Sequence, residues 1–253
     1  MKEWGLPRPA FATALAIGPL GMMIGSLIGG GLADRIGRRK VLLLNVLTFA
    51  VITLALAASS NLMMLTVLRF LAGIGLGGAM PNAAALVSEY VPKRVRGFAV
   101  TATIVCFPGG GALAAVLAGN VVPSYGWRTL FVIGGVIPLV LGAILLKVLP
   151  ESPRFMASRK ERWPELISML RRMGNDVPAD AACVEAGAQA KSDFGKNLAT
   201  LFSPEYRRDT LGLFFAFFFC LMAHNIGFAW IVAMLTGAGF PQPDASNALA
   251  AFN

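Results

Sequence analysis

Apolar stretches of 18 or more residues recur along the chain, and short segments between them carry most of the charges. Because about 20 consecutive apolar residues span a bilayer as a helix, each stretch predicts a transmembrane helix. Five helices are expected before residue 147 and a sixth after residue 210. They cover residues 9–33, 41–58, 62–87, 97–121, 129–146 and 211–235. A further apolar segment opens at residue 247, so the pattern favours an all-α membrane protein.

Turn-forming residues divide these helices. Residues 59–61 and 123–126 are rich in Ser, Asn, Pro and Gly and predict short turns. Pro108 and the three glycines that follow it are expected to interrupt the fourth helix, because proline removes a helical hydrogen bond. Residues 237–244 predict the turn after the sixth helix.

The loop between the first two helices is short and strongly basic. Residues 30–40 read GGLADRIGRRK, and a second basic loop follows the third helix. If the first loop is placed inside, eighteen of the 22 Lys and Arg residues lie on that side. Cytoplasmic loops carry such an excess of basic residues, so residues 30–40 are predicted to be cytoplasmic.

The character of the chain changes between residues 147 and 209. This segment contains eleven Lys or Arg and nine Asp or Glu residues, and residues 166–173 have the pattern of a short amphipathic helix. We interpret it as a cytoplasmic linker and not as a separate folded domain. The expected division is residues 1–149 for an N-terminal membrane half, 150–209 for the linker and 210–253 for the start of a C-terminal half.

Composition agrees with a membrane setting and excludes several functions. The chain of 253 residues is 56% hydrophobic and only 14% charged, where a soluble domain has about 25% charged residues. Its net charge of +9 lies in interhelical loops, so we predict no nucleic-acid partner. Three scattered cysteines and one histidine give no metal spacing, and there is no nucleotide-binding GxxxxGK[ST] loop. An enzyme is therefore not expected, and neither is a bound cofactor.

Four motifs occur in a fixed order along the first 155 residues. Residues 30–40 match G-xxx-D-R-x-G-R-R-K/R, and residues 69–77 match R-xxx-G-x-G-x-G. Residues 89–97 match E-xx-P-xxx-R-G, and residues 150–154 read PESPR. In these motifs the chain resembles the major facilitator superfamily of secondary transporters. Residues 68–101 and 126–155 look most similar to its aromatic acid:proton symporters.

The resemblance implies a fold and a function. Members of the superfamily have twelve helices in two halves, and this chain resembles helices two to seven plus the start of the eighth. The expectation is thus a partial helical bundle that lacks the first helix, from a truncated or mis-started reading frame. The implied function is proton-coupled import of small aromatic carboxylates such as benzoate or hydroxybenzoate, by alternating access in the bacterial inner membrane. Its implied partners are that carboxylate, a proton and the lipid bilayer.

The resemblance also implies an inner gate made of charged residues from two loops. The candidate gate and signature residues are Gly30, Asp34, Arg35, Gly37, Arg38, Arg39, Glu89 and Arg96. A carboxylate at a helix end can hold a neighbouring helix N-terminus or an arginine, and such contacts can break and reform between two states. Arg38, Arg39 and Lys40 have an alternative interpretation, in which they serve only to orient the chain in the membrane.

Three residues inside the predicted spans are candidates for substrate binding or proton coupling. Arg69 is costly within a bilayer unless it faces a cavity or a partner, so function is the first hypothesis. A substrate carboxylate or an acidic residue on the missing first helix would suit it; the alternative is a side chain that reaches the outer interface. His224 could relay protons beside Asn225, or simply form an interhelical hydrogen bond.

The sequence leaves two further functions open. The PESPR and RG elements also occur in sugar porters and organic-ion carriers, so a sugar or organic-ion facilitator is an alternative. A membrane fragment that transports nothing is a third possibility.

Overall fold

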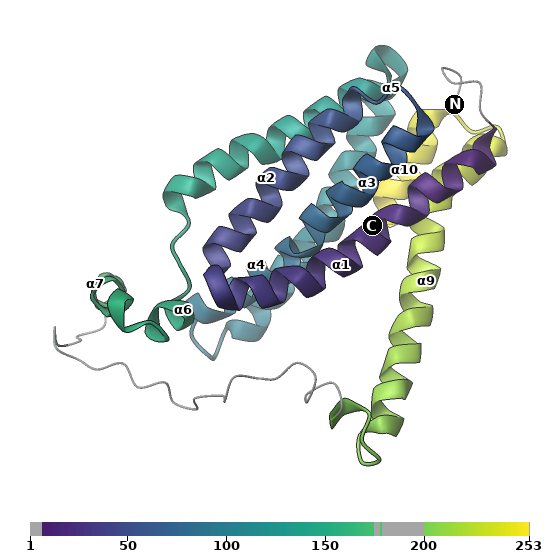
Figure 1. The fold of residues 1–253 in the computed structure, drawn as a ribbon. Helices are drawn as coiled ribbons and strands as arrows, with labels where there is room; N and C mark the ends of the chain where they lie inside the picture. Colours follow the sequence, from purple (N-terminus) through teal and green to yellow (C-terminus); the bar gives the residue numbers. More distant parts are fainter. Residues whose placement is uncertain (1–6, 175–177, 179–199, 253) are drawn as a thin grey trace.

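The computed structural model describes residues 7–174, 178 and 200–252. Every regular element in these residues is a helix (Figure 1), so the predicted all-α fold is confirmed. The helices of the main bundle are α1 (Ala12–Ile36), α2 (Arg38–Ala57), α3 (Leu62–Gly77), α4 (Ala79–Tyr90) and α5 (Arg96–Val148), preceded by η1 (Arg8–Phe11). The remaining elements are α6 (Pro153–Ala157), η2 (Lys160–Arg162), α7 (Trp163–Arg172), α9 (Arg207–Gly237) and α10 (Gln242–Phe252).

Four stretches in the described residues are long and apolar enough to cross a membrane: Ala12–Ile36, Arg38–Ala57, Leu62–Tyr90 and Arg96–Val148. The last has 53 residues and reverses direction at Gly126, whose φ of 80° and ψ of 169° are not helical. It therefore contains the predicted fourth and fifth helices, and the turn predicted at residues 123–126 is confirmed. The predicted interruption at Pro108 is wrong, because α5 continues through it. Membrane helices tolerate proline where neighbouring groups compensate for the lost hydrogen bond.

Helices α1 and α3 pack side by side at very close range (Figure 1). Gly21, Gly25 and Gly29 are buried along one stripe of α1. A Cβ atom at Gly25 would overlap the Ile74 carbonyl of α3, and one at Gly77 of α3 would overlap the Met22 carbonyl of α1. Small residues at four-residue spacing allow this approach of two backbones.

The predicted third span is present as Leu62–Tyr90, and within it the helix is divided at Gly78 into α3 and α4. Pro81 lies in the first turn of α4 and has no N–H to donate to the carbonyl one turn earlier. The buried side-chain amide of Asn82 donates to the carbonyls of Gly78, at 2.7 Å, and Gly29, at 3.3 Å. The buried asparagine therefore joins the start of α4 to the Gly78 carbonyl and to Gly29 of α1.

The described residues that directly follow α5 form short helices. Helices α6 and α7 lie at the end of the bundle that carries the α1–α2 turn (Figure 1), and the amphipathic helix predicted at residues 166–173 is confirmed as α7. Its residues Leu166 and Ile167 are buried. The alanine-rich part of the linker lies outside the described residues.

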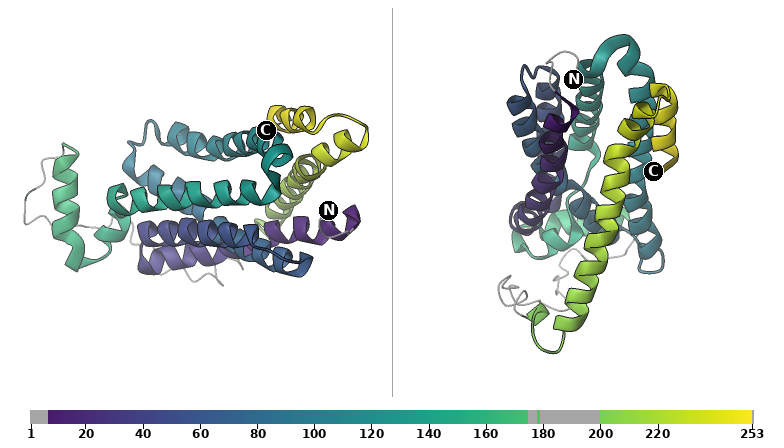
Figure 2. Two further views of the ribbon diagram at one scale, coloured as in Figure 1. Left: turned by 90° about the horizontal axis from the view of Figure 1, so that it is seen from above. Right: turned by 90° about the vertical axis from the view of Figure 1, so that its right-hand side faces the viewer.

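Helices α9 and α10 form a hairpin at one side of the bundle (Figure 2). α9 begins at Arg207, earlier than the predicted residue 211. α10 packs against both α9 and α5. In this contact a Cβ at Gly119 would lie 3.0 Å from Ser246 Cβ, so the two helices are close at small residues.

Candidate functional site

The basic turn between α1 and α2 is built around Gly37. Gly37 has a φ of 103°, a conformation that favours glycine. A Cβ there would also lie 2.5 Å from Glu151 Oε2. Both constraints explain why glycine occupies this predicted signature position.

Arg38, the next residue, forms an ion pair with the end of α4. Its Nε lies 3.1 Å from Glu89 Oε1, and both side chains are largely buried. Glu89 also accepts a hydrogen bond from the Ser152 hydroxyl. The structure thus places Arg38 of the basic turn against Glu89 at the end of α4.

Glu151 lies at the centre of the same network. Its side chain is 3% exposed, and its Oε1 accepts hydrogen bonds from the backbone N–H groups of Arg39 and Ser152, both at 3.0 Å. Arg162 Nη1 lies 3.8 Å from Oε2. A buried carboxylate is stable only with such partners, so Glu151 joins the turn to the segment that follows α5.

Three further hydrogen bonds connect the basic turn and the end of α1 to α4, α5 and the residues just before η2. The Tyr90 hydroxyl donates to the Glu151 carbonyl at 2.6 Å. Arg39 Nη2 donates to the Leu146 carbonyl at 2.5 Å, and Arg159 Nη2 donates to the Arg35 carbonyl at 2.7 Å. The turn, the end of α4 and the segment that follows α5 are thus held together in one unit.

Sequence reasoning did not assign roles to Glu151, Ser152 or Tyr90. The sequence signal for the first two was the PESPR motif, whose glutamate lies just after a predicted membrane helix. A carboxylate at that place, opposite a basic turn, could have been paired with it by charge alone. Tyr90 carried no comparable signal.

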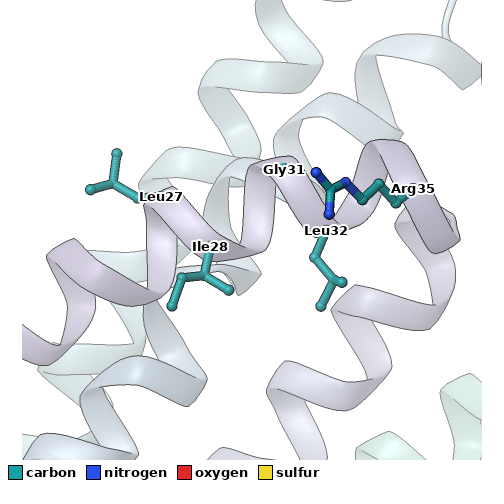
Figure 3. A pocket seen from close by; sticks show the side chains of 5 residues that line it. All are labelled: Leu27, Ile28, Gly31, Leu32 and Arg35. Atoms are coloured by element: carbon teal, nitrogen blue, oxygen red, sulfur yellow. The ribbon is translucent and has the colours of Figure 1, made fainter. Parts of the chain in front are cut away.

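Asp34 and Arg35 lie on the outer surface of α1 and do not join this network with their side chains. Both are exposed, and neither has a side-chain hydrogen bond or ion pair within the described residues. Arg35 borders a shallow groove of about 260 Å³ together with Leu27, Ile28, Gly31 and Leu32 (Figure 3). Gly30 lies beside it, and a Cβ there would meet open space. The end of α1 therefore presents this small, open groove together with the exposed carboxylate of Asp34.

Arg96 begins α5 and is exposed. The described part of the chain gives its side chain no ion pair with the basic turn. Of the two residues predicted to meet that turn, Glu89 does so and Arg96 does not.

Arg69 lies near the middle of α3, about two turns from the start of the helix. Its Nε is buried and has no hydrogen-bond partner among the described residues. The guanidinium carbon lies 5.8 Å from the centroid of the Phe131 ring. Arg69 is thus a charged group among membrane-spanning helices with unused hydrogen-bonding capacity.

His224 and Asn225 belong to α9. Their side chains lie outside the described part of the structure, so the prediction for them stays a prediction. In the described residues no group of three or more His, Cys, Asp or Glu side chains could hold a metal ion.

Comparison with known proteins identifies the family. Residues 1–252 match the model of the Major Facilitator Superfamily. The chain belongs to this superfamily. The recognition made from the four motifs is therefore confirmed, and so is the description of the chain as an integral membrane protein with a partial transporter fold.

Several relatives of this superfamily member are named as transporters of aromatic acids. It is 36% identical over 241 residues to a gallate transporter of Pseudomonas putida, covering 94% of this chain and 53% of the relative. It is 35% identical over 245 residues to a 4-hydroxybenzoate transporter of the same species, covering 97% and 55%. The chain spans about half the length of the curated relatives it matches.

Among solved structures, a D-xylose–proton symporter superposes with a TM-score of 0.67 over 98% of this chain and 57% of its own. The identity is 19%, so this likeness concerns the fold.

Proposed function

We propose that the complete protein is a secondary active transporter that imports small aromatic carboxylates together with protons, by alternating access. The names of the relatives support the substrate class, since they include transporters of gallate, 4-hydroxybenzoate and 3-(3-hydroxyphenyl)propionate. They favour it over the sugar or organic-ion alternative, because the sugar-transporting neighbour shares only the fold. Transport by the complete protein would also exclude the alternative of an inactive fragment.

The observation that carries the proposal is Arg69. An arginine within a membrane span marks a functional site unless it is fully paired, and Arg69 Nε has no partner among the described residues. A guanidinium binds a carboxylate through two parallel hydrogen bonds. The Phe131 ring beside it supplies an apolar wall of the kind that suits an aromatic substrate. Arg69 is therefore our proposed substrate-carboxylate site, with His224 and Asn225 proposed for proton coupling.

Uptake by bacterial cells tests this function. Cells that lack their own aromatic-acid carriers and express the complete protein should accumulate radiolabelled 4-hydroxybenzoate. An uncoupler that collapses the proton gradient should abolish accumulation, because no other energy source is proposed. Labelled xylose serves as the comparison substrate. Uptake of xylose without 4-hydroxybenzoate would support the sugar alternative, and uptake of neither by a well-inserted protein would support the inactive fragment.

We also propose that the end of α1 forms half of an inner gate. The gate residues would be the eight of the sequence prediction, with Arg38 and Glu89 bracing the turn and Asp34 facing outward. The open space at Gly30 and the exposure of Asp34 on the same helix face leave room for a helix end from the other half of the transporter. The carboxylate of Asp34 would stabilise the N-terminus of that helix through its dipole.

Asp34→Asn tests the gate. Removing the charge should lower the initial uptake rate by about tenfold, since a helix-terminus contact of roughly 1–2 kcal/mol would be lost. Membrane insertion, measured by immunoblot of washed membranes, should stay unchanged. Glu161→Gln removes a carboxylate that is also exposed and should transport normally. Normal uptake by Asp34→Asn would contradict the gate.

The membrane orientation and the division of the chain are part of the same proposal. We place the protein in the bacterial inner membrane with residues 30–40 and 150–209 in the cytoplasm, as the distribution of basic residues favours. Residues 1–149 and 210–253 would belong to the two membrane halves. The contacts of Glu151 and Tyr90 support grouping the first part of the linker with the N-terminal half.

A further inference from the structure

Four side chains form a continuous column at the end of the bundle opposite Gly37. We call it the arginine–aromatic column, and it consists of Arg69, Phe131, Trp127 and Arg128. The Arg69 guanidinium lies over the Phe131 ring at 5.8 Å, and the Phe131 and Trp127 rings meet edge to face at 5.8 Å and 86°. The Arg128 guanidinium lies over the Trp127 ring at 4.7 Å. Each step is at a favourable distance for a cation–π or an aromatic contact.

The Arg128 end of the column is anchored to the backbone. Its Nε donates to the Ala57 carbonyl and its Nη2 to the Ser59 carbonyl, both at 3.0 Å. Ala57 is the last residue of α2, and Ser59 is fully buried. The last carbonyls of a helix lack intrahelical partners and carry partial negative charge, so a cation that binds them is firmly held.

The Gly126 reversal brings these residues into line. Its positive φ turns the chain between the two runs of α5, so that Trp127 and Arg128 start the second run. Trp127 and Phe131 are then four residues apart and lie on the same helix face. Both rings also pack against the buried cluster of Ala14, Leu56, Leu65 and Ala72, which limits their movement.

At the Arg69 end of the column, an aromatic ring and not a backbone carbonyl contacts the guanidinium within the described residues. Its Nε has no hydrogen-bond partner in the described part of the chain, and the contact the structure gives its guanidinium is the Phe131 ring. An arginine side chain that can rotate freely loses conformational entropy when it binds a ligand. A ring packed against its guanidinium restricts that rotation beforehand and so reduces the entropic cost of binding. The Phe131 ring is thus the aromatic group against which the Arg69 guanidinium lies.

We propose that Arg128 is a positioning residue for Arg69, acting through Trp127 and Phe131. By anchoring the column to the end of α2, it holds the Arg69 guanidinium in the orientation that receives a carboxylate. This inference rests on the proposed function, in which Arg69 binds the substrate carboxylate. It adds that the affinity for an aromatic carboxylate is set partly by a residue that does not touch the substrate.

A double-mutant cycle in the complete protein tests this link. Arg128→Gln should raise KM for 4-hydroxybenzoate about tenfold and leave the maximal rate within about twofold, because binding is affected before translocation. Arg128→Lys, which keeps the charge near the carbonyls, should restore most of the affinity. In an Arg69→Lys background, Arg128→Gln should change KM less than about twofold, since coupled residues are non-additive. Equal effects in both backgrounds would mean that Arg128 acts independently of Arg69, and would overturn the proposal.

Trp127 fluorescence gives a readout that does not depend on transport. In a variant whose other three tryptophans are replaced by phenylalanine, Arg128→Gln and Arg69→Gln should each shift Trp127 emission and raise its quenching by iodide about twofold. Arg159→Gln is the matched control, because Arg159 also lies over an aromatic ring, that of Phe155, and donates to a carbonyl near a helix end. It should leave Trp127 unchanged. If Trp127 emission does not respond to Arg69→Gln, Arg69 is not coupled to Trp127 through Phe131, and the proposal is overturned.

The two measurements separate the inference from the function on which it rests. If Arg69→Lys leaves KM for 4-hydroxybenzoate unchanged, the assignment of Arg69 to the carboxylate fails, and the positioning role fails with it. If Arg69→Lys raises KM but Arg128→Gln does not, the proposed function stands and the positioning role is wrong.

Discussion

Gly25→Ala is expected to destabilise the helix bundle severely. The new methyl group would overlap the Ile74 carbonyl of α3, a backbone atom that cannot rotate away. Overpacking of this kind costs about 3 kcal/mol when the neighbour is rigid. Because α1 and α3 meet along a line of glycines, separation of the helices at this point would also weaken the contacts at Gly21 and Gly29. In size-exclusion chromatography after heating in detergent, the main peak of the purified variant should disappear at a markedly lower temperature than that of the unmodified chain.

Gly31→Ala is the matched control for this prediction. It lies on the same helix, six residues further on, where a Cβ meets open space. The same chemical change should there shift stability by less than about 1 kcal/mol, the difference in helix propensity between the two residues. Equal thermal stability of the two variants would contradict the close packing of α1 on α3.

Arg69→Gln is expected to produce the largest loss of transport. Glutamine has a similar length but no charge, and the charge-assisted hydrogen bonds to a carboxylate would be lost. These are worth up to about 3 kcal/mol, which corresponds to a fall of roughly 100-fold in the ratio of maximal rate to KM. Arg69→Lys keeps the charge but not the planar fork, so a smaller loss of about tenfold is expected. Initial rates of 4-hydroxybenzoate uptake over a range of concentrations would measure both.

Arg207→Gln controls for the loss of a positive charge. Arg207 is an exposed residue at the start of α9, far along the chain from the proposed substrate site. Its replacement should leave uptake within about twofold of the unmodified protein, as for most surface changes. If Arg69→Gln is inserted in the membrane at a normal level and transports normally, Arg69 does not bind the substrate.

The transmembrane helices could be predicted closely because the bilayer imposes a simple rule. Long apolar stretches between charged loops gave the helices of α1, α2, α5 and α9 to within a few residues. The same rule cannot detect a break inside an apolar stretch. The division at Gly78 depends on Pro81 and on the buried amide of Asn82, which joins α4 to α1. Hydropathy contains no information about such a hydrogen bond.

The candidate sites show the same limit. The motifs singled out both Arg38 and Glu89, which the structure brings together as an ion pair. They did not reveal that Glu151 lies under Gly37, because that contact joins residues more than a hundred positions apart. The motifs singled out Arg69, but the column that supports it depends on the reversal at Gly126.

The sequence by itself determined that this chain is a membrane-embedded helical bundle of a transporter superfamily, which side of it carries the basic loops, and which charged residues lie within the spans. These properties follow from local composition and spacing, because transfer from water to lipid depends on each segment separately. Only the tertiary structure decided how close the helices approach, which carboxylate the basic turn surrounds, and what supports Arg69. Those features depend on packing and hydrogen bonds between distant segments, and their free energy appears only when the helices are together.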